Sequence, residues 1–582
     1  MKSAHDTHAL AGNYRPEVDG LRAIAVLSVI LFHADFALFS GGFVGVDIFF
    51  VISGFLITGI LLEELRQGEF SFAAFYARRA RRILPALTVV LLVCAPAVWL
   101  LMPRNQVVDF FQAMAATAVF VANVFHGQHT GYFDTRIEQN PLLHTWSLSV
   151  EEQYYLLLPL LLLVLWRRPA QTRQRTLLAT LALLCVASLA VGEQGARYDQ
   201  NANFFASASR AWELLCGSFA AAACHAGVST RVAPQTASGR PAHRGLAALG
   251  LLGIVCAIGM YDRYTPSPSV WLLLPTLGAA LVLVFGDARS GVGRLLAWPG
   301  LVWLGLISYS AYLWHQPLLA LARAYSPMPL STSARLGLVF ATLCLAYLSW
   351  RWVERPFRAM VSVAPQRTLM AALAASLSLV ALGLGGASVV NSLGSSEPPS
   401  VAMAFLPPPR TQECLDISMA HDPTVKPDGW FCTLNPGSAQ APSFFVLGDS
   451  HGLQLVAAFD KAAASAHRTG QFAGFSGCIP LLGLYPLTRP NQARYDCHAL
   501  NARVLAHIKS QGIKELFLVA KWSYYTDFWN GTPYLNAVGL APTDDISQAQ
   551  SRKAFQAGLL DTVAAYQQLG VRLHVIEQVP QQ

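Results

Sequence analysis

Charged residues are scarce in this sequence. Only 13% of its 582 residues are Asp, Glu, Lys or Arg, whereas 54% are hydrophobic and the mean hydropathy is +0.40. A soluble globular chain carries about 25% charged residues, so this composition excludes that class and predicts a membrane protein. The net charge of +8 does not indicate a nucleic-acid-binding face, because the arginines gather in short segments between apolar runs.

Two further patterns are missing. The N-terminus lacks the charged start, short apolar run and small-residue cleavage site of a removable signal peptide, so we expect residues 1–13 to remain as a cytoplasmic tail. No repeat of hydropathy relates the two halves of the apolar region, although many transporters are built from such repeats. A proton-coupled transporter stays open as an alternative, because many helices with central charged groups also suit that class.

Apolar stretches long enough to span a bilayer recur along the first two thirds of the chain. We predict about eleven transmembrane helices, near residues 21–40, 44–64, 83–102, 146–166, 176–193, 204–226, 245–261, 270–286, 299–321, 333–350 and 368–390. A further stretch, 106–126, carries Asp109, Gln112 and Asn123. The basic loops, Arg66–Arg82 among them, all fall in the cytoplasm only if this stretch does not cross fully. We therefore predict that it is re-entrant or interfacial.

The composition changes late in the chain. Residues 391–410 are rich in serine and proline and predict a linker. With eleven crossings, the region beyond it lies in the periplasm of a bacterial cell. Its apolar runs of strand length, Phe444–Leu447, Leu516–Ala520 and Leu573–Ile576, alternate with amphipathic stretches such as Leu453–Ala466. This alternation predicts an α/β domain with a parallel sheet flanked by helices.

The ten cysteines divide between the two regions. Six lie in or beside apolar runs, where thiols are usually inert packing groups. The other four lie in the polar tail, and they are Cys414, Cys432, Cys478 and Cys497. An even number in a region outside the cytoplasm predicts two disulfides. Three pairings are possible, and we choose Cys414 with Cys432 and Cys478 with Cys497.

His33 is the most informative residue in the apolar runs, and it lies eleven positions after Arg22. Eleven steps of about 100° return to nearly the same helix face, and they span roughly 16 Å. One stripe of one helix thus carries a cation near one surface and an imidazole near mid-bilayer. Ionisable groups at that depth are costly, so they are candidates for a functional site. A histidine hydrogen-bonded to a neighbouring helix is the alternative.

More polar residues are buried in the apolar region. Toward the half of the membrane that contains His33 we place Glu151, Glu152, Arg210, Glu213 and His315. They face one another if the helices ring a common cavity; otherwise they pair locally, Arg210 with Glu213. On the opposite side lie Arg78, Arg79, Arg81 and Arg82. Four guanidinium groups so close suit either the phosphates of an anionic ligand or lipid headgroups at a topology anchor.

Five segments occur in a fixed order between residues 14 and 358. They are Pro16–Arg22 with His33, Gly45–Leu56, Trp146–Tyr154, Ser308–His315 and Glu354–Phe357. Together they resemble the membrane acyltransferase family 3. The resemblance implies a ten-helix unit over residues 14–358 that moves an acyl group, usually acetyl, from a cytoplasmic coenzyme A thioester to a sugar hydroxyl on the other side.

The resemblance also implies roles for individual residues. Arg22 and His33 match the signature arginine and histidine of the family, and we take both as catalytic. Coenzyme A is expected on the arginine cluster, at Arg78, Arg79 and Arg82. The residues expected to support the site or bind substrate are Asp47, Glu151, Glu152, Arg210 and His315. Acetyl-CoA is the expected acyl donor, and no metal is expected.

The polar tail carries a second resemblance. Val446–His451 is similar to the first block of SGNH-type hydrolases and esterases, in which a strand and a tight turn present a serine at a helix N-terminus. That position places Ser450 near amides that could stabilise an oxyanion, with Asp449 in support. A structural turn is the alternative for an isolated Gly-Asp-Ser, but the fusion to an acyltransferase favours the functional reading.

The tail departs from the family in two places. The sequence has no Asp-x-x-His motif near its end and no clean Gly-x-Asn block, although Val519–Trp522 stands near the expected place of the latter. We therefore expect the SGNH-like domain, residues 411–582, to be incomplete, and Ser450 has no identified base. A sugar-binding sensor with a degenerate hydrolase fold is one alternative.

Because it has an extra helix at 359–390 ahead of the tail, the chain resembles the fused subfamily that acetylates lipopolysaccharide O-antigen. We expect an inner-membrane O-acetyltransferase that moves acetyl from cytoplasmic acetyl-CoA to a periplasmic glycan. O-antigen is the acceptor that we expect, and peptidoglycan and exopolysaccharide are the alternatives. The expected partners are this glycan or a lipid-linked polysaccharide and membrane lipid, with no nucleic acid. His33 either activates the acceptor hydroxyl or carries the acyl group, and the sequence leaves both open.

Overall fold

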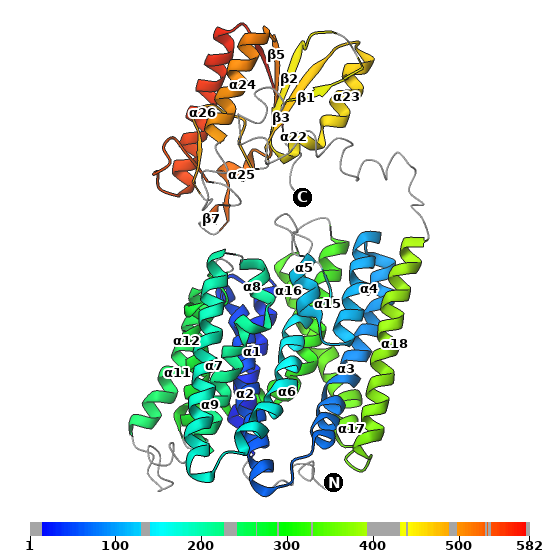
Figure 1. The fold of residues 1–582 in the computed structure, drawn as a ribbon, viewed down its shortest axis with the longest axis vertical. Helices are drawn as coiled ribbons and strands as arrows, with labels where there is room; N and C mark the ends of the chain where they lie inside the picture. The colour runs from blue at the N-terminus through cyan, green and yellow to red at the C-terminus, as the bar shows by residue number, and fades with distance from the viewer. Residues whose placement is uncertain are drawn as a thin grey trace. The chain divides into compact units, whose positions relative to one another are not determined.

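The chain forms two compact units in the computed structural model, Met1–Gly394 and Ser395–Gln582. The first is helical and the second contains the sheet (Figure 1). The structure describes residues 14–129, 140–198, 200–225, 241–262, 265–287, 290–326, 330–392, 431–437, 440–475, 477–487, 497–529, 532–533 and 537–577. The predicted N-terminal tail, the predicted linker from 393 onward and Cys414 lie outside the described residues.

The first unit is a bundle of helices (Figure 1). Its α-helices are α1 (Pro16–His33), α2 (Gly45–Gln67), α3 (Phe72–Leu101), α4 (Arg104–Ala118), α5 (Ala122–His129), α6 (Thr145–Trp166), α7 (Ala170–Tyr198), α8 (Gln200–Phe205), α9 (Ser207–His225), α11 (Pro241–Met260), α12 (Leu273–Phe285), α13 (Gly291–Leu296), α14 (Pro299–Leu306), α15 (Ser308–Tyr325), α16 (Thr332–Ser349), α17 (Arg355–Arg358) and α18 (Pro365–Ser392). Short helical turns of other types are η1 (Ala37–Phe39), η2 (Gly42–Val44), η4 (Val270–Leu272) and η5 (Trp350–Glu354).

Six helical spans within the described residues are long and apolar enough to cross a membrane. They are Gly42–Gln67, Phe72–Leu101, Thr145–Trp166, Ala170–Ala196, Thr332–Arg358 and Pro365–Ser392. Other predicted spans are shorter, more charged or broken. Helix α1 has 18 residues and carries Glu17, Asp19 and Arg22, and the predicted span 299–321 is divided between α14 and α15. The count of eleven crossings therefore stays a prediction.

The predicted basic loop Arg66–Arg82 is wrong over most of its length, because α3 already begins at Phe72. The hydroxyl of Ser71 accepts a hydrogen bond from the backbone N–H of Ala74 at 3.4 Å and so caps the helix. The alanines and arginines that follow also favour helix. The four arginines of the cluster thus project from a rigid helix rather than from a loop.

The predicted re-entrant stretch 106–126 forms two helices, α4 and α5, separated at 119–121. Helix α4 packs against α3 and α18. The side-chain amide of Asn123 is buried and donates to the carbonyl oxygen of Phe205 at 3.1 Å. This bond satisfies the polar group that makes the stretch less apolar than its neighbours, and its re-entrant character stays a prediction.

Helices α2 and α9 pack closely at two glycines. A Cβ on Gly217 would lie 2.0 Å from the carbonyl oxygen of Val51, and a Cβ on Gly54 would lie 1.9 Å from that of Leu214. Only residues without a side chain fit such an approach, which is a common way for membrane helices to associate. The contact aligns α2 and α9 and thereby positions the polar residues that both helices carry.

The second unit is built on a five-stranded sheet in the order β1-β3-β2-β5-β9. Its strands are β1 (Cys432–Leu434), β2 (Phe444–Gly448), β3 (Gly470–Gly474), β5 (Glu515–Val519) and β9 (Arg572–Ile576). Two small ribbons pair β4 (Tyr485–Pro486) with β8 (Val538–Gly539) and β6 (Phe528–Trp529) with β7 (Thr532–Pro533). The helices are α22 (Ser450–Gln454), α23 (Val456–Ser465), α24 (Cys497–Gln511), α25 (Ser523–Thr526) and α26 (Gln548–Gln568).

The three predicted strands are confirmed as β2, β5 and β9, and they run parallel with β3. Strand β1 is antiparallel to β3, so the sheet is mixed and the prediction of a parallel sheet is wrong at this edge. An antiparallel edge strand on a parallel sheet is common. Helix α23 covers one face, and α24 and α26 cover the other (Figure 1).

The second unit is fastened by a disulfide between Cys478 and Cys497, whose Cα atoms lie 5.4 Å apart. This pair confirms one of the two predicted bonds. Cys432 is also disulfide-bonded, while its predicted partner, Cys414, lies outside the described residues. The described cysteines of the first unit are not disulfide-bonded.

Candidate functional site

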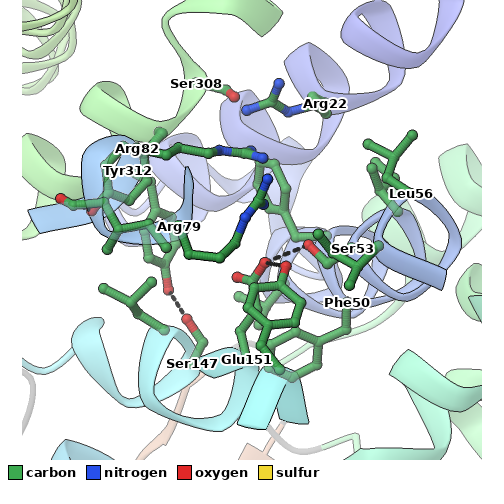
Figure 2. A pocket seen from close by; sticks show the side chains of 18 residues that line it. Arg22, Phe50, Ser53, Leu56, Arg79, Arg82, Ser147, Glu151, Ser308 and Tyr312 are labelled. Carbon is green, nitrogen blue, oxygen red and sulfur yellow. Dashed lines mark hydrogen bonds between the residues drawn. The ribbon is translucent and has the colours of Figure 1, made fainter. Parts of the chain in front are cut away.

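One cavity in the first unit is lined by α1, α2, α3, α6 and α15, and we call it the arginine cavity. Its lining residues are Arg22, Val46, Phe49, Phe50, Ile52, Ser53, Leu56, Ile57, Arg79, Arg82, Ile83, Ser147, Leu148, Glu151, Tyr155, Ser308, Tyr309 and Tyr312. Figure 2 shows the guanidinium groups of Arg22, Arg79 and Arg82 directed toward one region of this cavity. Three like charges converge there, so the cavity is suited to an anion.

The guanidinium groups of the cavity have few hydrogen-bond or ion-pair partners among the described residues. Arg22 contacts the carboxylate of Asp19 one turn away at 3.2 Å. The buried Nε of Arg79 has no hydrogen-bond partner among the described residues. A buried guanidinium normally pairs its donors, so this atom leaves a hydrogen-bond donor for a further acceptor. The phosphates of coenzyme A supply acceptors of that kind, and planar guanidinium groups pair well with them.

Two of the four arginines of α3 reach the cavity. Arg79 and Arg82 are three residues apart and therefore share a face of the helix. Arg78 points elsewhere and pairs with Glu64 at 2.6 Å, while Arg81 donates to the carbonyl oxygen of Met360 at 2.5 Å. The structure thus brings two of the three predicted coenzyme A ligands to the cavity and leaves Arg78 outside it.

Glu151 is the only carboxylate among the residues that line the arginine cavity. It accepts hydrogen bonds from the hydroxyls of Ser53, at 2.5 Å, and Tyr155 (Figure 2). These bonds fix its orientation beside the arginines. Glu152, the other predicted glutamate, does not line this cavity.

A second cavity, which we call the histidine cavity, is lined by Phe32, His33, Phe43, Val46, Asp47, Leu143, His144, Trp146, Phe204, Phe205, Arg210, Thr265, Ser267 and Tyr312. His33 is the last residue of α1, and its Nδ1 lies 3.0 Å from the carbonyl oxygen of Val29. Because a carbonyl oxygen only accepts, Nδ1 carries the hydrogen and Nε2 of the neutral ring carries the lone pair. That nitrogen is available as a base or nucleophile.

Two other histidines accompany His33. The ring centroid of His315 lies 5.1 Å from that of His33 and 5.3 Å from that of His144. His315 is fully buried on α15, and its Nδ1 lies 2.6 Å from the carbonyl oxygen of Tyr312. The sequence predicts His33 and His315 as site residues but not His144, although His144 lies two residues before the segment Trp146–Tyr154 that carries the family resemblance.

Arg210 is nearly fully buried, with 2% of its side chain exposed. Its guanidinium group contacts Asp47 of α2 at 2.8 Å, Glu213 one turn away at 3.1 Å and the hydroxyl of Ser267 at 3.0 Å. Arg210 therefore pairs with Glu213 on its own helix, as one prediction had it, and also contacts Asp47 on another helix, as the alternative had it. Breaking such a buried network by removing one partner is strongly destabilising, so its structural role is considerable.

In the second unit, the β2–α22 turn presents Ser450 at the first position of α22. Asp449 caps that helix by accepting from the N–H of His451 at 2.8 Å. Its other oxygen accepts from the backbone N–H of Lys521 and the hydroxyl of Tyr525, each at 3.0 Å. Asp449 therefore ties the turn to the segment that follows β5.

Within the described part of the chain, the hydroxyl of Ser450 makes no hydrogen bond. No general base among these residues is therefore in contact with it. The neighbouring His451 has 44% of its side chain exposed, and its Nδ1 lies 3.5 Å from Asp449. Its ring packs against Tyr524 at 5.6 Å. Burial, and then the charge of Asp449, raise the pKa of Tyr524, so this phenol is neutral near pH 7. The predicted nucleophile is thus presented without the partner that would activate it.

Known protein families match most of the chain. Residues 15–351 match the model of an acyltransferase domain, and residues 414–582 match that of an SGNH domain fused to such acyltransferase domains. No solved structure matches the chain.

Several curated bacterial proteins are similar to the first part of the chain. It is 32% identical over 357 residues to the putative peptidoglycan O-acetyltransferase YrhL of Bacillus subtilis, covering 59% of this chain and 55% of that protein. It is 31% identical over 358 residues to the peptidoglycan O-acetyltransferase OatA of Listeria monocytogenes, covering 59% and 56%. The putative membrane-bound transacylase BcsY of Komagataeibacter xylinus is 31% identical over 348 residues, covering 59% and 83%.

The chain spans little more than half the length of the first two relatives. The family model nevertheless covers more than half of this chain, and the matched range contains Arg22, His33 and the residues that line both cavities. Together with the apolar helices, this match describes a multi-pass membrane protein. The chain belongs to the membrane acyltransferase family 3 and carries an SGNH domain after its acyltransferase domain.

Proposed function

We propose that the protein is a membrane O-acetyltransferase that transfers acetyl from acetyl-CoA to a hydroxyl of a cell-envelope glycan. The observation that carries this proposal is the convergence of Arg22, Arg79 and Arg82 on one cavity while His33 lines a second cavity beside it. The first set of residues suits the phosphates of the donor. The imidazole suits the removal of a proton from an attacking hydroxyl.

The transfer reaction requires few chemical groups of the protein. In the transfer, an ester C–O bond forms, the thioester C–S bond breaks, and the hydroxyl proton passes by way of a base to the departing thiolate, which leaves as the thiol. Nε2 of His33 accepts that proton, and the bond from Nδ1 to Val29 holds the ring in the required tautomer. The same nitrogen could instead carry the acetyl group briefly, and both routes depend on His33.

Peptidoglycan is the acceptor that we propose, because relatives of the chain are named as peptidoglycan O-acetyltransferases. Neither of these two relatives is named for O-antigen acetylation, so the O-antigen acceptor expected from the fused subfamily gains no support from them. Exopolysaccharide remains the second candidate.

We place the chain in the bacterial inner membrane, with its eleventh crossing leading to an SGNH domain in the periplasm. The disulfide Cys478–Cys497 supports this placement, since disulfides persist in oxidising compartments. There Ser450 would accept the acetyl group or pass it to the sugar, once a base is supplied.

An acceptor assay tests the proposal. The full chain in lipid nanodiscs is given acetyl-labelled acetyl-CoA together with peptidoglycan, lipopolysaccharide or exopolysaccharide, and nanodiscs without the protein serve as the control. We expect label in ester linkage on peptidoglycan. Label on lipopolysaccharide alone would restore the O-antigen reading, and label on no glycan would contradict the transferase.

A further inference from the structure

We propose that Tyr312, latched to Ser147, forms a wall between the arginine cavity and the histidine cavity and decides whether the acyl group is transferred or hydrolysed. This inference rests on the proposed transferase function. It assigns Tyr312 a positioning role and leaves the proton chemistry to His33.

The two cavities share only two of their lining residues, Val46 of α2 and Tyr312 of α15. Arg22 lines one cavity and His33 lines the other, although both lie on α1. A donor held by the arginines is therefore separated from the imidazole by a valine side chain and a tyrosine ring. The acyl group and the acceptor hydroxyl have to meet at this wall.

The tyrosine is held in place by hydrogen bonds at its tip. The hydroxyls of Tyr312 and Ser147 lie 2.6 Å apart, as Figure 2 draws. Both also lie within reach of the carbonyl oxygen of His144, at 2.9 Å for Tyr312 and 3.2 Å for Ser147. Two hydroxyl hydrogens thus link three oxygen atoms, and each of these oxygen atoms takes part in a hydrogen bond.

The ring of Tyr312 is enclosed on both sides. It meets Phe49, which lines the arginine cavity, edge to face with 6.3 Å between centroids. It also packs at 5.3 Å from His144 and 5.2 Å from His315. The tyrosine therefore contacts Phe49 in the lining of the arginine cavity and His144 in the lining of the histidine cavity at the same time.

The wall matters because water competes with the acceptor hydroxyl. In hydrolysis a water oxygen attacks the thioester carbonyl, the C–S bond breaks, and acetate and free thiol are formed. The histidine cavity contains a base and polar groups that water can solvate. A closed partition keeps that water from a thioester in the arginine cavity until the acceptor is present, which is a recognised use of active-site closure.

The test compares thiol release with glycan acetylation. Tyr312→Ala removes the ring, Tyr312→Phe and Ser147→Ala each break the latch, and all are measured as full chains in nanodiscs with acetyl-CoA. For Tyr312→Ala we expect thiol release without acceptor to rise by about tenfold while the share of acetyl reaching glycan falls. The latch variants should show smaller changes in the same direction, and the KM for acetyl-CoA should stay close to that of the unaltered chain.

Tyr347→Ala is the matched control, because Tyr347 lies on α16 with 39% of its surface exposed and lines neither cavity. If the unaltered chain releases no thiol and labels no glycan, the proposed function itself fails. If the unaltered chain is active and the variants keep its ratio of thiol release to glycan acetylation, the proposed role of Tyr312 is refuted. An equal fall of both rates would also overturn it, because that result marks a purely structural residue. Should Tyr312→Ala not fold, the two latch variants decide the outcome by the same ratio.

Discussion

Arg22 and His33 illustrate how far single residues can be understood from the sequence. Their spacing predicts one helix face and two depths, and both residues do lie on α1 and line cavities. The sequence could not show that these are separate cavities, because the residue between them, Tyr312, comes from a helix almost 300 positions later. Distant contacts of this kind are set by packing rather than by local pattern.

The arginines of α3 give a direct test at this scale. Arg79→Gln with Arg82→Gln removes two guanidinium groups from the cavity, so we expect coenzyme A to bind roughly 10- to 100-fold more weakly, as for lost charge-assisted hydrogen bonds. Arg78→Gln is the control, because Arg78 pairs with Glu64 outside the cavity, and its effect should stay within about twofold. Titration calorimetry with coenzyme A measures both. Equal losses in the double variant and the control would refute the assignment.

At the scale of elements, hydropathy locates helices well but their ends and breaks poorly. The capping of α3 by Ser71 moves its start into a stretch predicted as a loop, because the arginines that signal a loop are also good helix formers. The short strand β1 carries no periodic signal, and so neither the strand nor its antiparallel pairing was predictable. The longer runs of β2, β5 and β9 were predictable because apolar residues predominate in each.

The contact between α2 and α9 makes a prediction about helix packing. Gly217→Leu places a side chain against the carbonyl oxygen of Val51, and overpacking of this kind costs about 1–3 kcal/mol. We expect a lower thermal unfolding temperature and a displaced contact between Arg210 and Asp47. Gly337→Leu on α16 is the matched control, because nothing lies within 4 Å of the added Cβ. Thermal unfolding followed by tryptophan fluorescence compares them, and equal midpoints would contradict the packing argument.

At the scale of the whole molecule, the sequence indicates a membrane unit followed by an α/β unit, and the structure has two compact units of these kinds. The change of composition after the last apolar helix makes this division visible. The partner that would activate Ser450 could not be derived, because the described residues bring no base to its hydroxyl and the sequence carries no matching motif. The acceptor glycan could not be predicted from the sequence either, because a protein distinguishes sugars by contacts that no short motif encodes.

In the mechanism that we propose, acetyl transfer depends on the imidazole of His33. This dependence is tested by His33→Ala in the full chain, with the initial rate of acetyl transfer from acetyl-CoA to glycan measured beside the affinity for coenzyme A. We expect the transfer rate to fall by about 10²- to 10⁴-fold, the usual contribution of a general base, while the affinity for coenzyme A stays nearly unchanged because His33 does not line the arginine cavity. Transfer at the rate of the unaltered chain would show that His33 does not perform it.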